Sequence, residues 1–165
     1  MNAFVIDAFE FCRLKERREG EVAVADLPRL ADESVDRKGM LAWTLHGGNN
    51  RQGHPQLSLS VSGSLHLMCQ RCLAPFEFKI ASDATLVLAQ DEGSADEIDA
   101  LLADESVEVI VGSHEFDIGQ VIEDEALLAI PLSPKHDVCP DLPAVKPAPE
   151  DEKVSPFAVL KKLKQ

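Results

Sequence analysis

Aromatic residues are scarce in this 165-residue chain, which contains seven phenylalanines, one tryptophan and no tyrosine. A platform that stacks single-stranded nucleic acid relies on exposed aromatic rings, so this scarcity weighs against one. Hydrophobic residues still make up 45% of the sequence. That share is enough for a proper core and argues against global disorder. We expect a core built mainly from leucine, valine, isoleucine and alanine.

Basic residues are missing from one long stretch of the chain. Between Ile80 and Pro134 there is no lysine or arginine, whereas 14 of the 29 acidic residues lie there. This stretch accounts for the net charge of -13. It would repel phosphate backbones and attract basic partners at long range. Two interpretations stay open: a solvated surface that keeps the chain soluble, or a docking surface for a basic protein.

Targeting signals and disulfide patterns are also absent. The first residues lack the segments of a secretory signal, and the longest apolar runs, such as Ala126–Leu132, are too short to cross a membrane. The four cysteines are too few and too unevenly spaced for a disulfide scaffold. We therefore expect a cytoplasmic protein that makes no membrane contact.

Catalytic motifs are not found. No serine lies in a nucleophile elbow, the five histidines are scattered, and there is no P-loop or G-x-G-x-x-G. Glu123, Asp124 and Glu125 could be imagined as a magnesium cluster. Consecutive residues of a helix point apart, however, which favours a solvated face instead. We expect neither an enzyme nor a small-molecule substrate.

The strongest periodicity predicts the fold class. Apolar and polar residues alternate from Leu57 to Leu67 and again from Phe76 to Leu88, which indicates two long strands of an antiparallel hairpin. Gly63 falls in the apolar register and suggests a bend. Helical spacing follows over 118–129. The prediction is an α+β fold: a mainly antiparallel sheet with a long central hairpin and a few packed helices.

Weaker patterns predict the remaining elements. We expect a helix over 8–18 capped by Asp7, strands over 21–25, 40–46 and 107–111, a turn or short helix over 27–31, a turn over 47–50 and a mobile loop over 91–99.

The composition changes after Pro134, where prolines become frequent. We predict a single α+β domain over 1–135, a flexible proline-rich linker over 136–154 and a short amphipathic helix over 155–165. Phe157, Leu160 and Leu163 would share one face of that helix. They could cover an apolar groove on this same protein, or together with Pro156 they could offer a helix-in-groove motif to a partner.

One pair of cysteines has the spacing of a metal site. Cys69-Gln70-Arg71-Cys72 lies at the predicted strand-to-strand turn, where a C-x2-C can bring two thiolates onto one tetrahedral metal. A redox pair would instead sit where a strand enters a helix. His136 and Cys139 are the candidates for the two further ligands. Three cysteines and one histidine form an acceptable zinc set, and the alternative is unligated cysteines that behave as small hydrophobes.

Three separated motifs resemble a known family in their order. They are the C-x2-C with Pro75-Phe76, the run from Val121 to Leu132 with His136 and Cys139, and the C-terminal Pro156-Phe157-Ala158-Val159-Leu160. In this order they resemble the bacterial YceD-like family of large ribosomal RNA subunit accumulation proteins. The resemblance implies a role in the synthesis, processing or stability of that RNA (23S) without a known catalytic activity.

The chain departs from part of that family in its second cysteine motif. Many members carry Cys-Pro-x-Cys-Gly after the helix, and those with both pairs look like four-cysteine zinc proteins. Here Cys139-Pro140-Asp141-Leu142 keeps the first cysteine and places Leu142 at the second. The resemblance therefore implies either a site completed by His136 or a lost site.

Three functions are consistent with these features. The first is a ribosome-biogenesis factor that contacts a basic ribosomal or assembly protein through the acidic stretch, with any contact to ribosomal RNA indirect. The second is a direct RNA binder that uses Arg13, Lys15, Arg17, Arg18 and the tail lysines, although Glu16 and Glu19 weaken its positive field. The third is a zinc- or thiol-containing regulatory protein or thiol enzyme.

Overall fold

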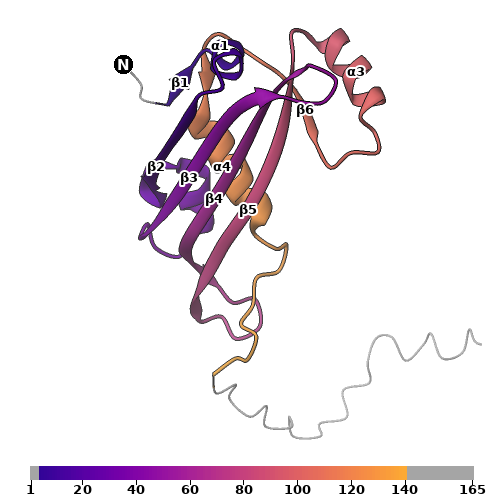
Figure 1. The fold of residues 1–165 in the computed structure, drawn as a ribbon. Coiled ribbons are helices and arrows are strands. Elements are labelled where there is room, and N and C mark those ends of the chain that lie inside the picture. Colours follow the sequence, from indigo (N-terminus) through magenta and orange to yellow (C-terminus); the bar gives the residue numbers. More distant parts are fainter. Residues whose placement is uncertain (1–3, 141–165) are drawn as a thin grey trace, which may run out of the picture.

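A computed structural model describes residues 4–140, and the sheet is its central element (Figure 1). Five strands form this sheet: β2 (Arg17–Ala23), β3 (Gly39–Asn49), β4 (Pro55–Met68), β5 (Pro75–Ala89) and β6 (Glu108–Val111). They lie in the order β2-β3-β4-β5-β6, antiparallel except for the β5–β6 pair. A two-stranded ribbon joins β1 (Val5–Ile6) to β7 (Phe116–Asp117).

The predicted hairpin is confirmed as the spine of the fold. β4 pairs with β5 without a break in register, from Gln56 opposite Val87 to Met68 opposite Pro75. Because side chains alternate across a strand, the apolar register of β4 faces one side. The large apolar side chains of this face are at most 2% exposed: Leu57, Leu59, Val61, Leu65 and Leu67. The α+β class and the mainly antiparallel sheet are confirmed.

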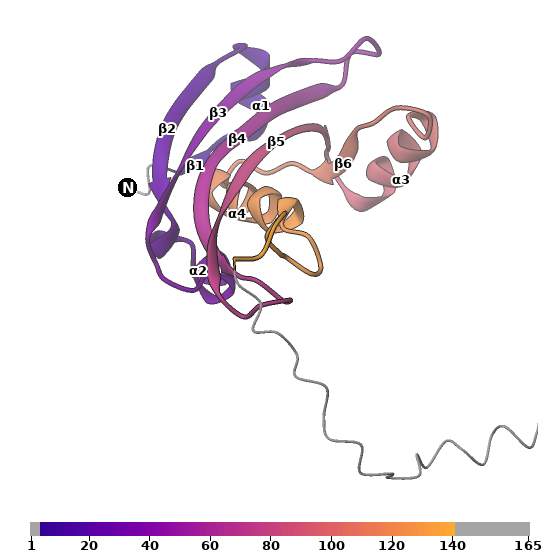
Figure 2. The ribbon, with the colours of Figure 1, turned by 90° about the horizontal axis from the view of Figure 1, so that it is seen from below.

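Helices cover the concave face of this curved sheet (Figure 2). The longest is α4 (Ile118–Ala129), which buries Ile118, Ile122 and Ala126. α1 (Ala8–Arg13), the 3-10 turn η1 (Val24–Asp26) and α2 (Pro28–Glu33) close the same core. No helix among residues 4–140 is long and apolar enough to span a membrane.

The first helix ends earlier than predicted. It stops at Arg13 instead of continuing to Arg18. Lys15 takes a left-handed backbone conformation (φ 52°), and the N–H of Glu16 donates to the carbonyl of Phe11. The chain thus reverses and β2 starts at Arg17. β3 likewise continues to Asn49, so the reverse turn comes after the predicted 47–50.

The prediction of a mobile loop over 91–99 is wrong. These residues begin α3 (Glu92–Leu101), which is capped by Asp91 through a hydrogen bond from the N–H of Ser94. None of the helix residues is buried, and Leu102, directly after it, is 3% exposed. A local cap, the half-buried Ala95 and Ile98 and the buried Leu102 together hold this segment in place.

Glu123 also differs from its predicted environment. It was expected on a solvated face, yet it is 5% exposed. Its carboxylate accepts hydrogen bonds from the backbone N–H groups of Arg29 and Leu30, at the start of α2. The carboxylate of Glu123 therefore joins α4 to the start of α2.

Candidate metal centre

The C-x2-C motif lies in the tight turn between β4 and β5, as predicted. The Cys69 N–H donates to the Ala74 carbonyl at 3.0 Å, and the Leu73 N–H donates to the Cys69 carbonyl at 2.9 Å. Leu73 has a left-handed backbone (φ 58°), which completes the reversal. The N–H of Arg71 points at the Cys69 sulfur, 3.4 Å away. The turn therefore places the Cys69 sulfur where it accepts a hydrogen bond from a backbone N–H of the same turn.

The segment after α4 supplies the other two side chains. The carbonyl of Pro134 accepts a 2.8 Å hydrogen bond from the N–H of Gln70, which fastens this segment to the cysteine turn. The N–H of His136 then donates to the Cys69 sulfur at 3.4 Å. The His136 ring packs against Phe76, with 4.9 Å between the ring centroids.

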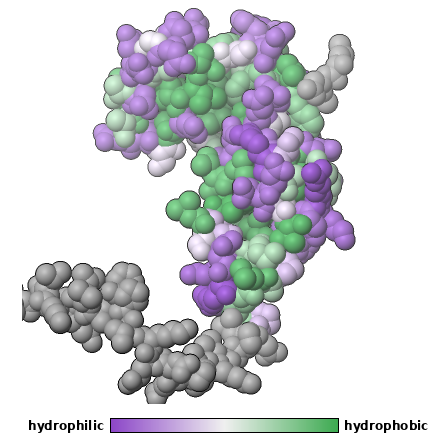
Figure 3. All heavy atoms as spheres, turned by 180° about the vertical axis from the view of Figure 1, so that it is seen from behind, coloured by the Kyte–Doolittle hydropathy of each residue, from purple (hydrophilic) through white to green (hydrophobic). Residues whose placement is uncertain are grey.

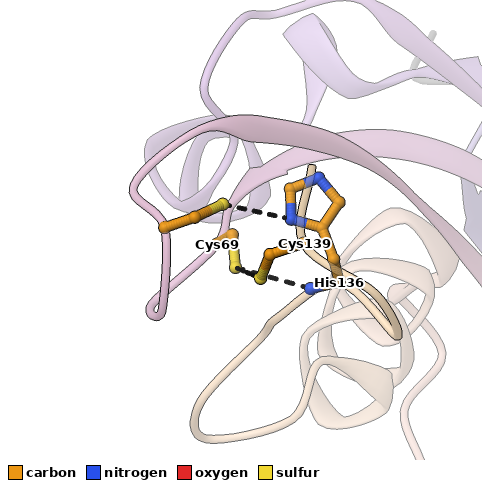
Figure 4. Close-up of side chains that lie close together, drawn as sticks. Cys69, His136 and Cys139 are labelled. Atoms are coloured by element: carbon orange, nitrogen blue, oxygen red, sulfur yellow. Dashed lines mark hydrogen bonds between the residues drawn. The ribbon is translucent and has the colours of Figure 1, made fainter. Parts of the chain in front are cut away.

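Four candidate ligands meet at this junction (Figure 4). The Cys69 and Cys139 sulfurs are 3.8 Å apart, and the Cys72 sulfur lies 3.4 Å from His136 Nδ1. All four ligand atoms are within 4.8 Å of one another. Cys69 is fully buried and the other three are half-buried. The sequence prediction that these residues come together is confirmed.

The spacing of these atoms matches a tetrahedral site. Bond lengths of about 2.3 Å to sulfur and about 2.0–2.1 Å to nitrogen place ligand atoms about 3.8 Å apart for two sulfurs and about 3.6 Å apart for sulfur and nitrogen. The measured separations of 3.8 and 3.4 Å lie close to these edges. The residues present therefore fit a zinc ion.

Hydrogen bonds favour the thiolate form of Cys69, one member of the cluster. Burial opposes the charged form of Cys69, but N–H groups of Cys72, His136 and Arg71 outweigh it and lower the pKa of this thiol to about 5. Burial, together with the hydrogen bonds to Cys69 and Cys72, raises the pKa of Cys139. Cysteine binds a metal as the thiolate, so a bound cation would favour the deprotonated form of these thiols.

The remaining cysteine belongs to a different environment. Cys12 is buried on α1, and its thiol donates to the Gln56 carbonyl at 3.3 Å. Burial raises the pKa of this thiol. All four cysteines are free, and no disulfide joins any of them. Cys12 is therefore a packing residue, and it provides an internal control for the cluster.

Two parts of the site could not be predicted from motifs. The Pro134 carbonyl and the Phe76 ring hold the second ligand segment in place, and neither is a metal ligand. The predicted tail residues Pro156, Phe157, Leu160 and Leu163 lie outside the described residues, as do the helix over 155–165 and most of the predicted linker.

Comparison with known proteins agrees with the order of the motifs. The family model of the large ribosomal RNA subunit accumulation protein YceD matches residues 57–164. No curated protein and no solved structure matches the chain. The match begins in β4 and includes all four residues of the cluster as well as the C-terminal motif. The chain belongs to the YceD family of large ribosomal RNA subunit accumulation proteins.

Proposed function

We propose that this chain is a non-enzymatic ribosome-biogenesis factor of the cytoplasm. It supports the synthesis, processing or stability of 23S ribosomal RNA by contacting a basic ribosomal or assembly protein. Membership of the YceD family supports the connection to ribosomal RNA accumulation. The distribution of charge supports the mode of action.

The acidic helix α3 is the observation that carries this proposal. It lies at the margin of the molecule, beyond β6 (Figure 2). The acidic residues of α3 and its flanks are exposed: Asp91, Glu92, Asp96, Glu97, Asp99, Asp104 and Glu105. No lysine or arginine lies between residues 80 and 134 to balance them. Such a surface attracts a basic protein and repels bare RNA.

The basic residues near the N-terminus argue against direct RNA binding there. Arg13 pairs with Glu10 at 2.9 Å, and Arg17 pairs with Glu19 at 2.6 Å. These pairs engage two of the four basic residues near the N-terminus that would otherwise contact phosphates. We therefore rank a direct RNA binder second.

The cluster of Cys69, Cys72, His136 and Cys139 holds a structural zinc ion in this proposal. When bound, the metal would supply a cross-link between the β4–β5 turn and the segment after α4. The protein side of this arrangement is the Gln70–Pro134 hydrogen bond and the packing of His136 on Phe76. Because residue 139 is one of the ligands, the cross-link also fixes the place where the C-terminal segment begins.

The C-terminal segment is a second proposed contact. Pro156, Phe157, Leu160 and Leu163 would bind an apolar groove of the partner, and neighbouring lysines would add charge attraction. The alternative is that these residues cover a groove of this same protein. Deletion of residues 150–165 separates the two: lost partner retention at unchanged stability supports a partner motif, and lost stability with retained binding supports the alternative.

The test of the function is a chromosomal deletion in the organism that encodes the chain. We expect the ratio of 23S to 16S ribosomal RNA to fall, and the wild-type chain to restore it. A variant with Asp96→Asn, Glu97→Gln and Asp99→Asn should fold normally and fail to restore the ratio. A deletion that leaves 23S levels unchanged would overturn the proposal. Salt-dependent retention on ribosomal proteins but not on RNA would separate the two candidate modes.

A further inference from the structure

The lower part of β5 forms an open edge of the sheet. β6 pairs only with residues 86–89 of this strand, whereas β4 pairs with it from Pro75 to Val87. No other strand among residues 4–140 pairs with β5. The side of β5 away from β4 is therefore unpaired from Pro75 to Thr85 within the described part of the chain (Figure 1).

The register identifies the backbone groups that point to this open edge. In an antiparallel pair, hydrogen-bonded and non-hydrogen-bonded positions alternate. The bond from the Cys69 N–H to the Ala74 carbonyl makes that pair a hydrogen-bonded one. With the unbroken register, the N–H and C=O groups of the odd-numbered β5 residues then point away from β4. These residues are Glu77, Lys79, Ala81 and Asp83.

Two separate contacts agree with this assignment. The Ala89 carbonyl accepts a hydrogen bond from the N–H of Gly112 on the β6 side, as an odd-numbered residue of β5 should. Pro75 has no N–H to donate, and it lies at an odd-numbered position, where the β4–β5 pairing uses no N–H from β5. For every residue of β5, it is thus known whether the N–H and C=O groups point toward β4 or away from it.

Burial also decreases at this edge. The large apolar side chains of β4 that face the core are fully buried, and so are Leu86 and Leu88 where β6 covers β5. On the same face of the uncovered part, Phe76, Phe78 and Ala84 are only half-buried, although Ile80 is buried. An open groove of about 560 Å³ runs along Phe76 and Phe78, between them and residues 135–138.

The surface is also concave on this side of the molecule when it is seen from behind (Figure 3). The molecule is hollowed below the part that carries α3, and apolar surface lies beside this hollow. Unpaired strand edges can bind other strands, and this edge lies beside half-buried phenylalanines. The edge and the groove together have the shape of a strand-binding site.

We propose that a partner segment adds to the sheet as an extended strand along β5, from Glu77 to Asp83. This inference rests on the proposed function, since it describes how the same basic protein is held. Backbone hydrogen bonds would supply affinity, and side chains that alternate between the two faces would supply specificity. The occupant is an extended segment of a basic protein, with alternating apolar and basic residues.

The surroundings of the edge favour that chemistry. Apolar residues of the incoming strand would lie beside Phe76 and Phe78 and complete their burial. Its basic residues would meet Glu77 and Asp83 on the outer face, where Lys79 is the one cation between them. Beyond the upper end of the edge lies the acidic helix α3. The strand site and the acidic surface therefore form one continuous binding face for a basic chain.

Amide hydrogen exchange on the full-length protein gives a direct test. The probe is a synthetic nine-residue peptide of alternating lysine and valine. The amides of Glu77, Lys79, Ala81 and Asp83 should exchange fast in the free protein and at least tenfold more slowly with the peptide. The even-numbered amides of Phe78, Ile80 and Ser82 should be slow in both states. The same peptide with every backbone nitrogen methylated has no N–H on either edge, cannot form the strand pairing and should give no protection.

Proline substitution supplies the matched variant. Ala81 is exposed, and its N–H points to the open edge, so Ala81→Pro removes one donor without breaking the β4–β5 ladder. Ala81→Val keeps the N–H and serves as the control. Both variants should keep the wild-type circular dichroism spectrum. Peptide affinity should fall at least tenfold for Ala81→Pro only.

Other outcomes would overturn the inference. Odd-numbered amides that are already protected in the free chain, and become exposed on deletion of residues 141–165, would show that the protein's own tail is the occupant. Protection that rises with protein concentration would assign the edge to a second copy. No change on adding the peptide would show that the edge binds no strand. None of these results depends on 23S levels, so failure of this inference and failure of the proposed function are distinguishable.

Discussion

The carboxylate of Glu123, on α4, accepts hydrogen bonds from both the backbone and the side chain of Arg29, at the start of α2. The backbone N–H of Arg29 donates at 2.6 Å and its Nε donates at 3.1 Å. Leu27, the residue before α2, offers no side-chain cap. A side chain 94 residues away in sequence therefore caps the short helix and ties it to α4.

Loss of this carboxylate should destabilise the fold markedly. In Glu123→Ala the first N–H groups of α2 stay buried without an acceptor, and hydrogen bonds to charged groups contribute about 1.5–3 kcal/mol each. We expect the free energy of unfolding to fall by about 2–3 kcal/mol in urea denaturation. Asp124→Ala removes the exposed carboxylate that pairs with the same Arg29. That control should change stability by less than about 1 kcal/mol. Equal effects of the two changes would contradict the capping role.

Local patterns in the sequence were sufficient to predict some of these features. The β4–β5 hairpin follows from the two runs of alternation over 57–67 and 76–88, and α4 follows from apolar spacing after Asp117. The cluster follows from C-x2-C and H-x2-C, because each pair is fixed by a short turn and only the meeting of the two pairs is non-local. These features depend on residues close to one another in sequence.

The missed features depend on distant partners. Glu123 is followed in sequence by Asp124 and Glu125, a pattern typical of an exposed helix face. It is buried only because α2 packs against it in the folded chain. In α3 the apolar residues Ala95, Ile98 and Leu102 recur at helical spacing, but they are few among acidic residues, and only the packing of α3 against β5 and β6 shows that the segment is a helix. The open edge of β5 depends on how short β6 is, which alternation within β5 does not indicate.

Zinc content provides a second prediction. The purified wild-type chain should contain one zinc ion per molecule, measured by elemental mass spectrometry. Cys72→Ser should lose the metal and lower the thermal midpoint, because it removes a ligand and opens the cross-link between the turn and the segment after α4. Addition of a strong chelator to the wild type should produce the same midpoint.

Cys12→Ala is the control for that experiment. It removes a buried cysteine far from the cluster and should leave the zinc content unchanged. A wild-type chain that contains no zinc after purification with added zinc, and in which the thiols of Cys69, Cys72 and Cys139 react with a thiol reagent in the folded state, would rule out the metal centre.

The contact between His114 and Asp7 gives a pH-dependent prediction. Their side chains lie 2.5 Å apart. The hydrogen bond and the charge of Asp7 raise the pKa of His114. The hydrogen bond from the N–H of Glu10, followed by that from His114, lowers the pKa of Asp7. The stabilisation from His114 is therefore complete at pH values below the ordinary histidine pKa of about 6.5, and it is lost as pH rises through the raised pKa. The stabilisation from Asp7 is lost as pH falls through its lowered pKa.

Nuclear magnetic resonance titration can measure this contact. In Asp7→Asn the His114 pKa should fall back toward its ordinary value, since asparagine still caps α1 but carries no charge. The stability difference between this variant and the wild type should shrink as pH rises past the His114 pKa. Glu115→Gln removes a charge beside the histidine that makes no bond to its ring, so it should shift the pKa less. An unchanged His114 pKa in Asp7→Asn would contradict the pairing.

Gly63 tests how closely the two central strands approach each other. It lies in the apolar register of β4, opposite Leu41 and Ile80, with a backbone φ of +159°. A Cβ at this position would collide with the carbonyl oxygen of Met40 and lie 2.8 Å from a methyl carbon of Leu41. Gly63→Ala should therefore cost about 1–3 kcal/mol of unfolding free energy, the usual range for an overpacked core. Gly48→Ala, in the neighbouring strand, meets nothing within 4 Å and should be neutral or stabilise the fold by about 0.4–1 kcal/mol. If urea denaturation gives the same midpoint for both variants, the pairing of β3 with β4 does not require the tight approach at Gly63.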